Sequence, residues 1–245
     1  MPRSSLVLSA ALLSAGCATL GAPPPDEARP GPSAIALARH LEDVVGIRAW
    51  RATGAIRWRL ASGALHLWDK RRNLDRQELR DGTTIWINLG TRRGRVERDG
   101  APLRGPEAEA LLARAYARWA NDSFWLNPLA KLFDEGVVLS RIDRLPDQPD
   151  AMGLVVEYQR GGVTPGDRYL WVVPGRGPPR AWRMWVSVLP VGGLEASWDG
   201  WVKTKTGAWI STAHRVLFIT LRIKELETAT RVEELAGGQD PFAVL

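Results

Sequence analysis

The side chains best suited to proton transfer or metal binding in this sequence are three histidines, His40, His66 and His214. They are scattered along the chain and lack the spacing typical of metal ligands. A single cysteine, Cys17, excludes a Cys-x-x-Cys motif and an intramolecular disulfide. No Gly-x-Ser-x-Gly elbow, phosphate-binding loop or dinucleotide fingerprint occurs. We therefore predict no catalytic residue, no metal and no cofactor, and we expect ordinary helix or strand positions for the histidines.

Acidic side chains offer a different chemistry. Asp122, Asp134 and Asp167 could act as a general acid and base if the fold brought two of them together. Aspartates beside asparagine, glycine and proline more often cap helices and turns. Lys131 and Asp134 are three residues apart, a spacing typical of a local ion pair. These four residues and Asn121 are the polar site candidates, and a hydrolase built on the acidic ones is our third functional hypothesis.

The mid-chain stretch over residues 121–139 predicts a joint between a helix and a strand. It places Phe124 and Trp125 directly after a helical pattern, and Pro128 ends or kinks any helix that reaches it. Gly136 then permits a turn before a β-branched run. We expect a helix, an apolar plug, a turn and a strand.

The N-terminal residues have the pattern of a secretory signal. Arg3 precedes a short apolar run, residues 6–13, far below the about 18 to 20 residues needed to cross a bilayer. Small residues then precede Cys17, and this segment resembles the lipobox of bacterial lipoproteins. The resemblance implies that residues 1–16 are removed and that Cys17 carries lipid. By the same resemblance, Ala18 in place of an aspartate implies sorting to the periplasmic face of the outer membrane.

Residues 17–32 are rich in proline, so we predict an extended tether of about 3 Å per residue that holds the folded part away from the membrane. Residues 33–245 suit a single domain. The net charge is +6, but the basic residues are mostly arginines spread over many segments, without a recognisable nucleic-acid module. Arginine, alanine, glycine and proline are all plentiful, so we attribute this charge to the coding bias of a GC-rich genome. Its partner, if any, is expected to be an anionic membrane surface and not nucleic acid, and we expect a monomeric protein.

Hydrophobic periodicity predicts two series of strands around one helix. A first helix is expected from Ser33 to Val45, ended by Gly46. The period then changes to two and predicts a strand over Trp50–Leu60. Pro106 begins the interior helix at a favoured first-turn position.

The other expected strands are separated by turn signals, among them Asp81-Gly82 and Asp99-Gly100. They lie at residues 65–68, 76–80, 83–89, 93–98, 137–142, 154–159, 168–173, 181–189 and 195–202. The apolar run 209–223 is either one very long strand or conceals a hairpin or bulge, and the tail after Ala236 is expected to be loosely held. This pattern predicts an α+β fold, with a large antiparallel sheet and few helices.

Several motifs resemble a family of uncharacterised bacterial secreted lipoproteins, similar to the lipoprotein-sorting carriers LolA and LolB. They are the mid-chain block, the Thr164-Pro165-Gly166-Asp167 step with Tyr169, and tryptophan strands around residues 182–185 and 198–201. The resemblance implies a strongly curved antiparallel sheet, an open half barrel, with helices covering the concave face. It also implies an apolar cavity that receives acyl chains.

The leading functional hypothesis is therefore a non-catalytic lipoprotein that binds or carries a lipid or an acylated ligand. The candidate cavity residues are aromatic and aliphatic: Trp50, Ile56, Trp58, Phe124, Trp125, Leu126, Leu129, Phe133, Trp171, Trp182 and Trp185. The alternative is that these side chains fill the core of a structural or partner-binding envelope lipoprotein. Both hypotheses remain open, because fold-level analogy is weak evidence for function.

Overall fold

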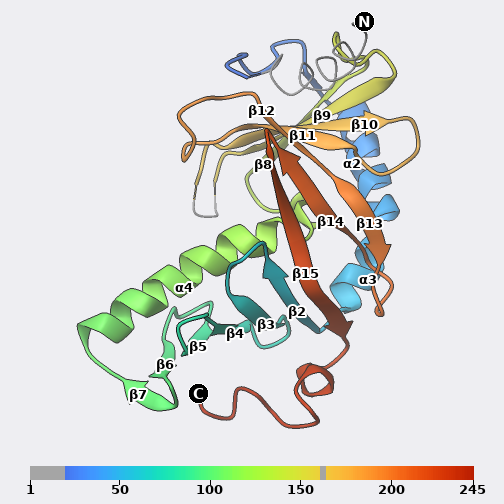
Figure 1. Cartoon of the computed structure of the whole chain (residues 1–245). Helices are drawn as coiled ribbons and strands as arrows, with labels where there is room; N and C mark the ends of the chain where they lie inside the picture. Colours follow the sequence, from blue (N-terminus) through green and yellow to red (C-terminus); the bar gives the residue numbers. More distant parts are fainter. Residues whose placement is uncertain (1–19, 161–163) are drawn as a thin grey trace, which may run out of the picture. The chain divides into compact units, whose positions relative to one another are not determined.

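The computed structural model of the chain describes residues 20–160 and 164–245, so Cys17 and the predicted signal, residues 1–16, lie outside the described residues. The described part has three α-helices, α2 (Pro32–Val44), α3 (Ile47–Ala52) and α4 (Pro106–Phe124) (Figure 1). It also has two short 3-10 helices, η1 (Pro128–Lys131) and η2 (Val232–Leu235). No helix in this part is long and apolar enough to span a membrane.

Fifteen strands of the described chain form one antiparallel sheet. Those before α4 are β1 (Arg29–Pro30), β2 (Ala55–Leu60), β3 (Leu65–Asp69), β4 (Leu74–Glu78), β5 (Thr83–Asn88), β6 (Gly94–Arg98) and β7 (Ala101–Leu103). Those after it are β8 (Val137–Ile142), β9 (Ala151–Tyr158), β10 (Arg168–Pro174), β11 (Ala181–Trp185), β12 (Leu194–Ser197), β13 (Asp199–Lys203), β14 (Trp209–Val216) and β15 (Ile219–Ala229). The strand order is β1-β8-β9-β10-β11-β12-β14-β15-β2-β3-β4-β5-β6-β7, with β13 paired to β14. The predicted large antiparallel sheet with few helices is confirmed.

The chain forms two compact units. Unit 1 contains the described residues within 1–41, 132–199 and 213–220, and unit 2 contains residues 42–131, 200–212 and 221–245. The predicted single domain, residues 33–245, therefore includes parts of both units. Two of the boundaries between them fall inside β14 and β15.

In unit 2, strands β2 to β6 are covered on both faces. Helix α4 buries Ala108, Leu111 and Ala115, which recur at helical spacing, against apolar side chains of β5 and β6. On the opposite face, side chains of β2, β3 and β4 pack against Val232 and Phe242 of the C-terminal segment. Figure 1 shows α4 and this segment on opposite sides of the strands.

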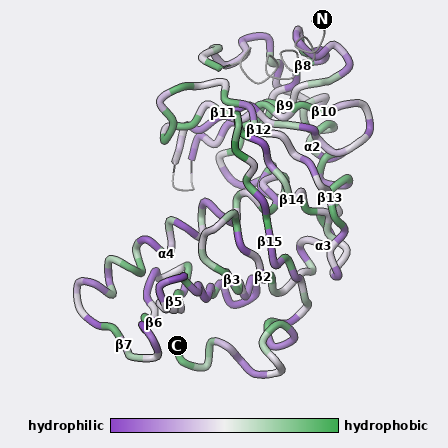
Figure 2. The backbone as a smooth tube through the Cα atoms, viewed as in Figure 1, coloured by the Kyte–Doolittle hydropathy of each residue, from purple (hydrophilic) through white to green (hydrophobic). Residues whose placement is uncertain are grey.

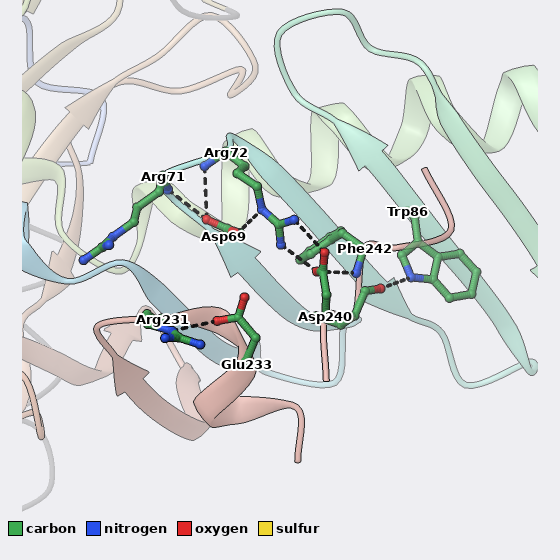
Figure 3. A network of polar contacts seen from close by, with 9 residues as sticks. Asp69, Arg71, Arg72, Trp86, Arg231, Glu233, Asp240 and Phe242 are labelled. Atoms are coloured by element: carbon green, nitrogen blue, oxygen red, sulfur yellow. Dashed lines mark hydrogen bonds and ion pairs between the residues drawn. The ribbon is translucent and has the colours of Figure 1, made fainter. Parts of the chain in front are cut away.

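The C-terminal segment is firmly held, so the expectation of a loose tail after Ala236 is wrong. The Arg72 guanidinium donates to both carboxylate oxygens of Asp240, at 2.8 and 2.7 Å (Figure 3). Its Nε donates to Asp69 at 2.6 Å, so one arginine joins the end of β3 to the tail. A bidentate arginine–carboxylate pair of this kind fixes the relative orientation of the two side chains and also contributes charge-assisted hydrogen bonds.

A hydrogen bond and an apolar cluster reinforce the same attachment. The Trp86 indole on β5 donates to the Pro241 carbonyl at 2.9 Å, and Phe242 is only 3% exposed. The partners of the tail lie far earlier in the chain, so local composition could not predict them.

Unit 1 builds its core from strands β8 to β11. Its buried apolar cluster consists of Ile142, Leu145, Ala151, Val155, Leu170, Val172 and Ala181. The N-terminal segment is attached to this unit: β1 pairs with β8, and the backbone N–H of Gly21 donates to the Gly192 carbonyl at 2.8 Å. The described part of the predicted tether, residues 20–32, is therefore bonded to unit 1 and is not a free spacer.

Several predicted elements agree with the structure. The first expected helix is α2, and Pro106 occupies a first-turn position of α4. Both Asp-Gly steps join antiparallel strands, and Gly100 has a φ of 80° that suits a tight hairpin turn. Gly136, with a φ of 79°, precedes β8 as expected.

The predicted strand over Trp50–Leu60 is wrong in its first half. Gly46 adopts a left-handed φ of 66° and is followed by α3, so the strand begins only at Ala55. Ile47 and Trp50 are three residues apart and are buried together, which is helical spacing. A stretch this short matches both periods, so the alternating pattern was misleading.

The long apolar run 209–223 conceals a hairpin. Leu217 has a φ of 53° between β14 and β15, so the turn is made without glycine or proline. The expected strand 195–202 is divided into β12 and β13, and the expected strand 181–189 ends at Trp185.

Candidate functional site

A buried histidine bridges two aspartates in unit 2. His66 on β3 has its Nδ1 2.9 Å from Asp75 Oδ2 on β4, and its Nε2 3.2 Å from Asp122 Oδ2 near the end of α4. His66 and Asp75 are completely buried, and Asp122 is 6% exposed. Because both ring nitrogens face carboxylates, the arrangement suits an imidazolium that donates through both N–H groups.

Sheet register and helix periodicity together produce this arrangement. His66 lies opposite Gln77, so Asp75 lies diagonally across from His66 on the same face of the sheet. Asp122 follows Ala115 by two helical turns and continues the buried stripe of α4. The helix therefore presents a carboxylate to the sheet where its pattern would otherwise place an apolar residue.

Gln77 extends the network from β4 to α4. Its Nε2 donates to Asp75 Oδ2 at 2.8 Å and to the Ala115 carbonyl at 2.7 Å. Its Oε1 accepts a hydrogen bond from Arg118 Nη1 at 2.5 Å. The amide group of Gln77 is thus held by Ala115 and Arg118 of α4 while it donates to the Asp75 carboxylate.

Two further contacts orient the other members. Asn121 Nδ2 donates to Asp122 Oδ1 at 2.8 Å. The Trp58 ring stacks on His66, with 4.4 Å between ring centroids and 12° between planes. A tryptophan face against an imidazolium is a favourable cation–π arrangement.

The charges decide the protonation state of His66. Burial by itself lowers the pKa of an imidazole, but Asp75 and Asp122 outweigh it and raise the pKa of His66 to about 9. Burial raises the pKa of Asp75, while His66 and Gln77 oppose that rise. Near neutral pH, His66 is therefore cationic and faces two carboxyl groups.

This geometry favours a structural tie over a catalytic centre. A general base needs a ring nitrogen free to reach a substrate, and both nitrogens of His66 are occupied and buried. No group of three or more His, Cys, Asp or Glu side chains suited to a metal ion occurs in the described part of the chain. The network joins β3, β4 and α4 through charge-assisted hydrogen bonds.

A second unusual cation lies nearby in unit 2. Lys70 Nζ donates to the Trp50 carbonyl at 2.5 Å and lies 4.1 Å from the centroid of the Trp50 ring. It is also 5.8 Å from the centroid of the Trp68 ring. Burial lowers the pKa of Lys70 to about 8. Helix α3 and strand β3 thus meet around an amine, an arrangement that stabilises α3 on the sheet.

Unit 1 contains a separate cluster of buried rings. Trp171, Trp182 and Trp198 are at most 2% exposed, and their ring centroids lie 4.9 to 5.0 Å apart. The His214 ring lies 4.4 Å from that of Trp198, and its Nδ1 is 3.2 Å from the Ser197 carbonyl. Burial lowers the pKa of His214 to about 4, so this imidazole is neutral at physiological pH.

The predicted cavity residues belong to different clusters. Trp50, Ile56, Trp58 and Leu126 share one buried cluster of unit 2, with Trp125 packed against it. Leu129 is fully buried and Phe124 is partly buried, in the same unit.

The remaining cavity candidates lie in unit 1. Trp171 and Trp182 belong to its ring cluster. Trp185 is partly buried, and its indole donates to the Ala22 carbonyl at 2.8 Å. Phe133 is 37% exposed, with the Arg39 guanidinium 3.6 Å from its ring centroid. Within each unit, these rings are therefore in contact with other groups of the protein.

The predicted polar residues are also distributed between the units. Asp122 and Asn121 belong to the His66 network of unit 2, whereas Lys131 and Asp134 are exposed. Asp167 accepts hydrogen bonds from the Thr164 hydroxyl at 2.6 Å and from the Ser187 N–H at 2.8 Å. Asp167 therefore fixes loops, as its neighbours in the sequence suggested, while Asp122 does not act as a cap.

Sequence reasoning missed His66, Asp75 and Gln77 because each was judged alone. Their signal is positional: all three lie on the face of the sheet that also carries the buried Ile85 and Ile87 of β5. A polar residue on an apolar face needs a partner, and the stripe of α4 ends in Asp122. Matching these two patterns could have found the network.

Two small surface hollows occur in unit 2. One, of about 290 Å³, is lined by Val96, Leu103, Ala108 and Leu112, with Arg95 and Arg104 beside them. The other, of about 280 Å³, lies among Lys203, Lys205, Thr228, Glu234 and Leu235. Both are smaller than the 300 to 1,000 Å³ typical of ligand pockets.

No protein-family model matches the chain, and no curated protein sequence matches it either. Function is therefore inferred from the residues and their geometry.

Proposed function

We propose that this chain is a non-catalytic lipoprotein, anchored through Cys17 at the periplasmic face of the outer membrane, that acts as a monomeric structural or partner-binding protein. The observation that carries the proposal is the filling of both units by their own aromatic side chains. The rings of Trp171, Trp182 and Trp198 contact one another, and Trp58 stacks on His66. Such close-packed interiors suit a rigid binding scaffold.

The attachment of the N-terminal segment supports the anchored arrangement. Gly21 is bonded to Gly192, and Cys17 precedes Gly21 by four residues. Four residues span at most about 14 Å. A lipid on Cys17 would therefore keep the loop around Gly192 close to the membrane surface.

The carboxylates offered for hydrolysis have other partners, which favours binding over catalysis. Asp122 is engaged with His66, and Asp167 accepts hydrogen bonds from two loops. The third hypothesis, a hydrolase built on the acidic residues, is the least supported by this geometry.

Carriage of a lipid or an acylated ligand is the second candidate function. It is favoured by the hollow beside α4, whose apolar lining includes Val96, Leu103 and Leu112, with two arginines beside it. Arginine suits a carboxylate or phosphate headgroup. A strongly curved half-barrel sheet with helices over its concave face, as in LolA and LolB, belongs to this second proposal.

The anchor is tested by Cys17→Ser. This variant should accumulate as an unprocessed precursor without acyl groups, as measured by mass spectrometry and membrane fractionation. Normal processing and an unchanged acylated mass would exclude lipidation at Cys17.

The choice between scaffold and carrier is tested by native mass spectrometry of the purified mature protein. The scaffold proposal predicts a protein whose mass matches the chain and its covalent lipid alone. A further bound lipid, lost from a variant with the hollow blocked by Leu112→Trp but retained in an Arg176→Ala control, would favour the carrier.

A further inference from the structure

Unit 1 exposes a group of large apolar side chains at the turn between β14 and β15. Phe218 is 90% exposed, Ile219 57% and Leu217 48%. The loop between β11 and β12 adds Val188, at 73%, and Val191, at 42%. We call these five side chains the apolar tip. Exposed groups of this kind mark interaction sites more often than isolated apolar residues do.

The two segments of the apolar tip lie at the same end of β12. Ala196 on β12 pairs with Val216 on β14 in antiparallel register. Continuing that register by two residues brings Phe218 level with Leu194, where the β11–β12 loop ends. Figure 1 shows the start of β15 next to β12, and Figure 2 shows hydrophobic colour along much of the β11–β12 loop.

The N-terminal segment arrives at this loop. Gly21 donates to the carbonyl of Gly192, the residue after Val191, at 2.8 Å, and the Trp185 indole donates to the Ala22 carbonyl at 2.8 Å. Leu20, the first described residue, is 41% exposed. An anchor on Cys17 would thus be at most about 14 Å along the chain from Gly21, which is bonded to the β11–β12 loop that carries Val188 and Val191.

The composition of the tip suits lipid better than a charged protein surface. Residues 216–221 and 186–193 contain no charged side chain. Aromatic and aliphatic side chains insert between lipid headgroups and acyl chains, and a second point of attachment strengthens a lipid anchor.

We propose that the apolar tip inserts into the same membrane that holds the lipid of Cys17, so that unit 1 is attached at two points. The proposal rests on the proposed function, because the anchor selects a lipid bilayer, and neither a second copy of the chain nor another protein, as the occupant of the tip. Insertion at the tip would restrict the orientation of unit 1 on the membrane surface.

A single introduced thiol tests this insertion. Once Cys17 carries lipid, Phe218→Cys provides the one free thiol of the mature sequence. It can be labelled with an environment-sensitive fluorophore, and the 90% exposure of Phe218 makes the substitution mild. Arg176→Cys is the matched control, because Arg176 is exposed in the turn at the other end of β11 in the same unit.

The labelled mature proteins are reconstituted in vesicles of phosphatidylethanolamine and phosphatidylglycerol. The label at position 218 should shift to shorter emission wavelength and be quenched several-fold more by spin-labelled lipid than the label at 176. Equal, aqueous behaviour of both labels would overturn the proposal. Shielding of the label at 218 before vesicles are added, together with a doubled native mass, would assign the tip to a second copy of the chain and also overturn it.

The mass of each labelled protein separates this proposal from the anchor. An acylated protein whose tip stays in water contradicts insertion but retains the proposed anchor. A protein without acyl groups contradicts the anchor, and adding vesicles to that protein still measures insertion of the tip. In a second variant, Ile219→Asp combined with Val188→Cys, the label at 188 should lose most of its lipid quenching relative to Val188→Cys alone.

Discussion

At the scale of single residues, His66 and His214 have opposite charge states although both are buried. Burial disfavours the imidazolium at each site. His66 lies between two aspartates, which raise its pKa to about 9, whereas His214 has a backbone carbonyl as its partner and a pKa of about 4. Partner chemistry, and not burial, therefore determines which histidine is charged.

The His66 network should make the protein less stable as the pH rises. The folded pKa of His66 is above the ordinary value of 6.5, so folding strengthens proton binding. The resulting stabilisation is complete below pH 6.5 and is lost as the pH rises through about 9. A pKa difference of this size corresponds to roughly 3 kcal/mol in the free energy of unfolding.

Urea unfolding at a series of pH values measures this effect, with His66→Gln as the reference. The reference is needed because the lowered pKa of Lys70 makes stability rise between about pH 8 and 10.5, in the opposite direction. The stability difference between wild type and His66→Gln should shrink from pH 6.5 to 9. Asp122→Asn should lower the pKa of His66 in an NMR titration, whereas the exposed Asp134→Asn should not. A pH-independent difference would contradict the assignment.

At the scale of elements, the sequence predicted what local patterns determine. Pro106 marked the start of α4, and the Asp-Gly steps marked hairpins, because each acts on backbone conformation within a few residues. Helix α3 was missed because six residues are too few to separate a period of two from one of 3.6. The turn at Leu217 was missed because it has neither glycine nor proline.

The site was less predictable than the fold. His66 and Asp122 are 56 residues apart in sequence, and their contact depends on how α4 lies on the sheet. Long-range contacts of this kind leave no local motif. The attachment of the C-terminal segment to Arg72 and Trp86 was missed for the same reason.

The C-terminal segment should act as a structural element that covers one face of unit 2. Phe242→Ala removes a ring that is 3% exposed against Ala55, Leu67 and Leu74, and should destabilise the protein by about 3 kcal/mol. The Trp86 indole N–H, which donates to Pro241, should also exchange faster with solvent.

Urea unfolding and hydrogen exchange by NMR measure these two effects. Val244→Ala is the matched control, because Val244 is in the same segment and 44% exposed, and it should change stability by less than about 0.5 kcal/mol. Equal effects of the two variants would place Phe242 outside the core.

At the scale of the whole molecule, the two units have different interiors. Unit 2 combines apolar clusters with a buried charged network, whereas unit 1 is filled by tryptophans and by the buried Arg183, which pairs with Asp147 and Glu195. The chain moves between the units inside strands β14 and β15. Changes in the interior of either unit are therefore expected to reduce stability before they affect any exposed binding surface.

The predicted cavity residues either enclose space or pack against one another. Ile56 is completely buried, in the cluster that contains Trp58 and Leu126. In a filled interior, Ile56→Trp should destabilise the protein by about 1 to 3 kcal/mol, because overpacking forces neighbours to move. Val186→Trp is the control, since Val186 is only partly buried and follows the end of β11; it should cost less than about 0.5 kcal/mol. The melting temperature and the affinity for a hydrophobic fluorescent probe are measured on the same proteins. Stoichiometric probe binding by the parent, displaced by phospholipid and lost in Ile56→Trp without a fall in melting temperature, would contradict the filled interior and favour the carrier.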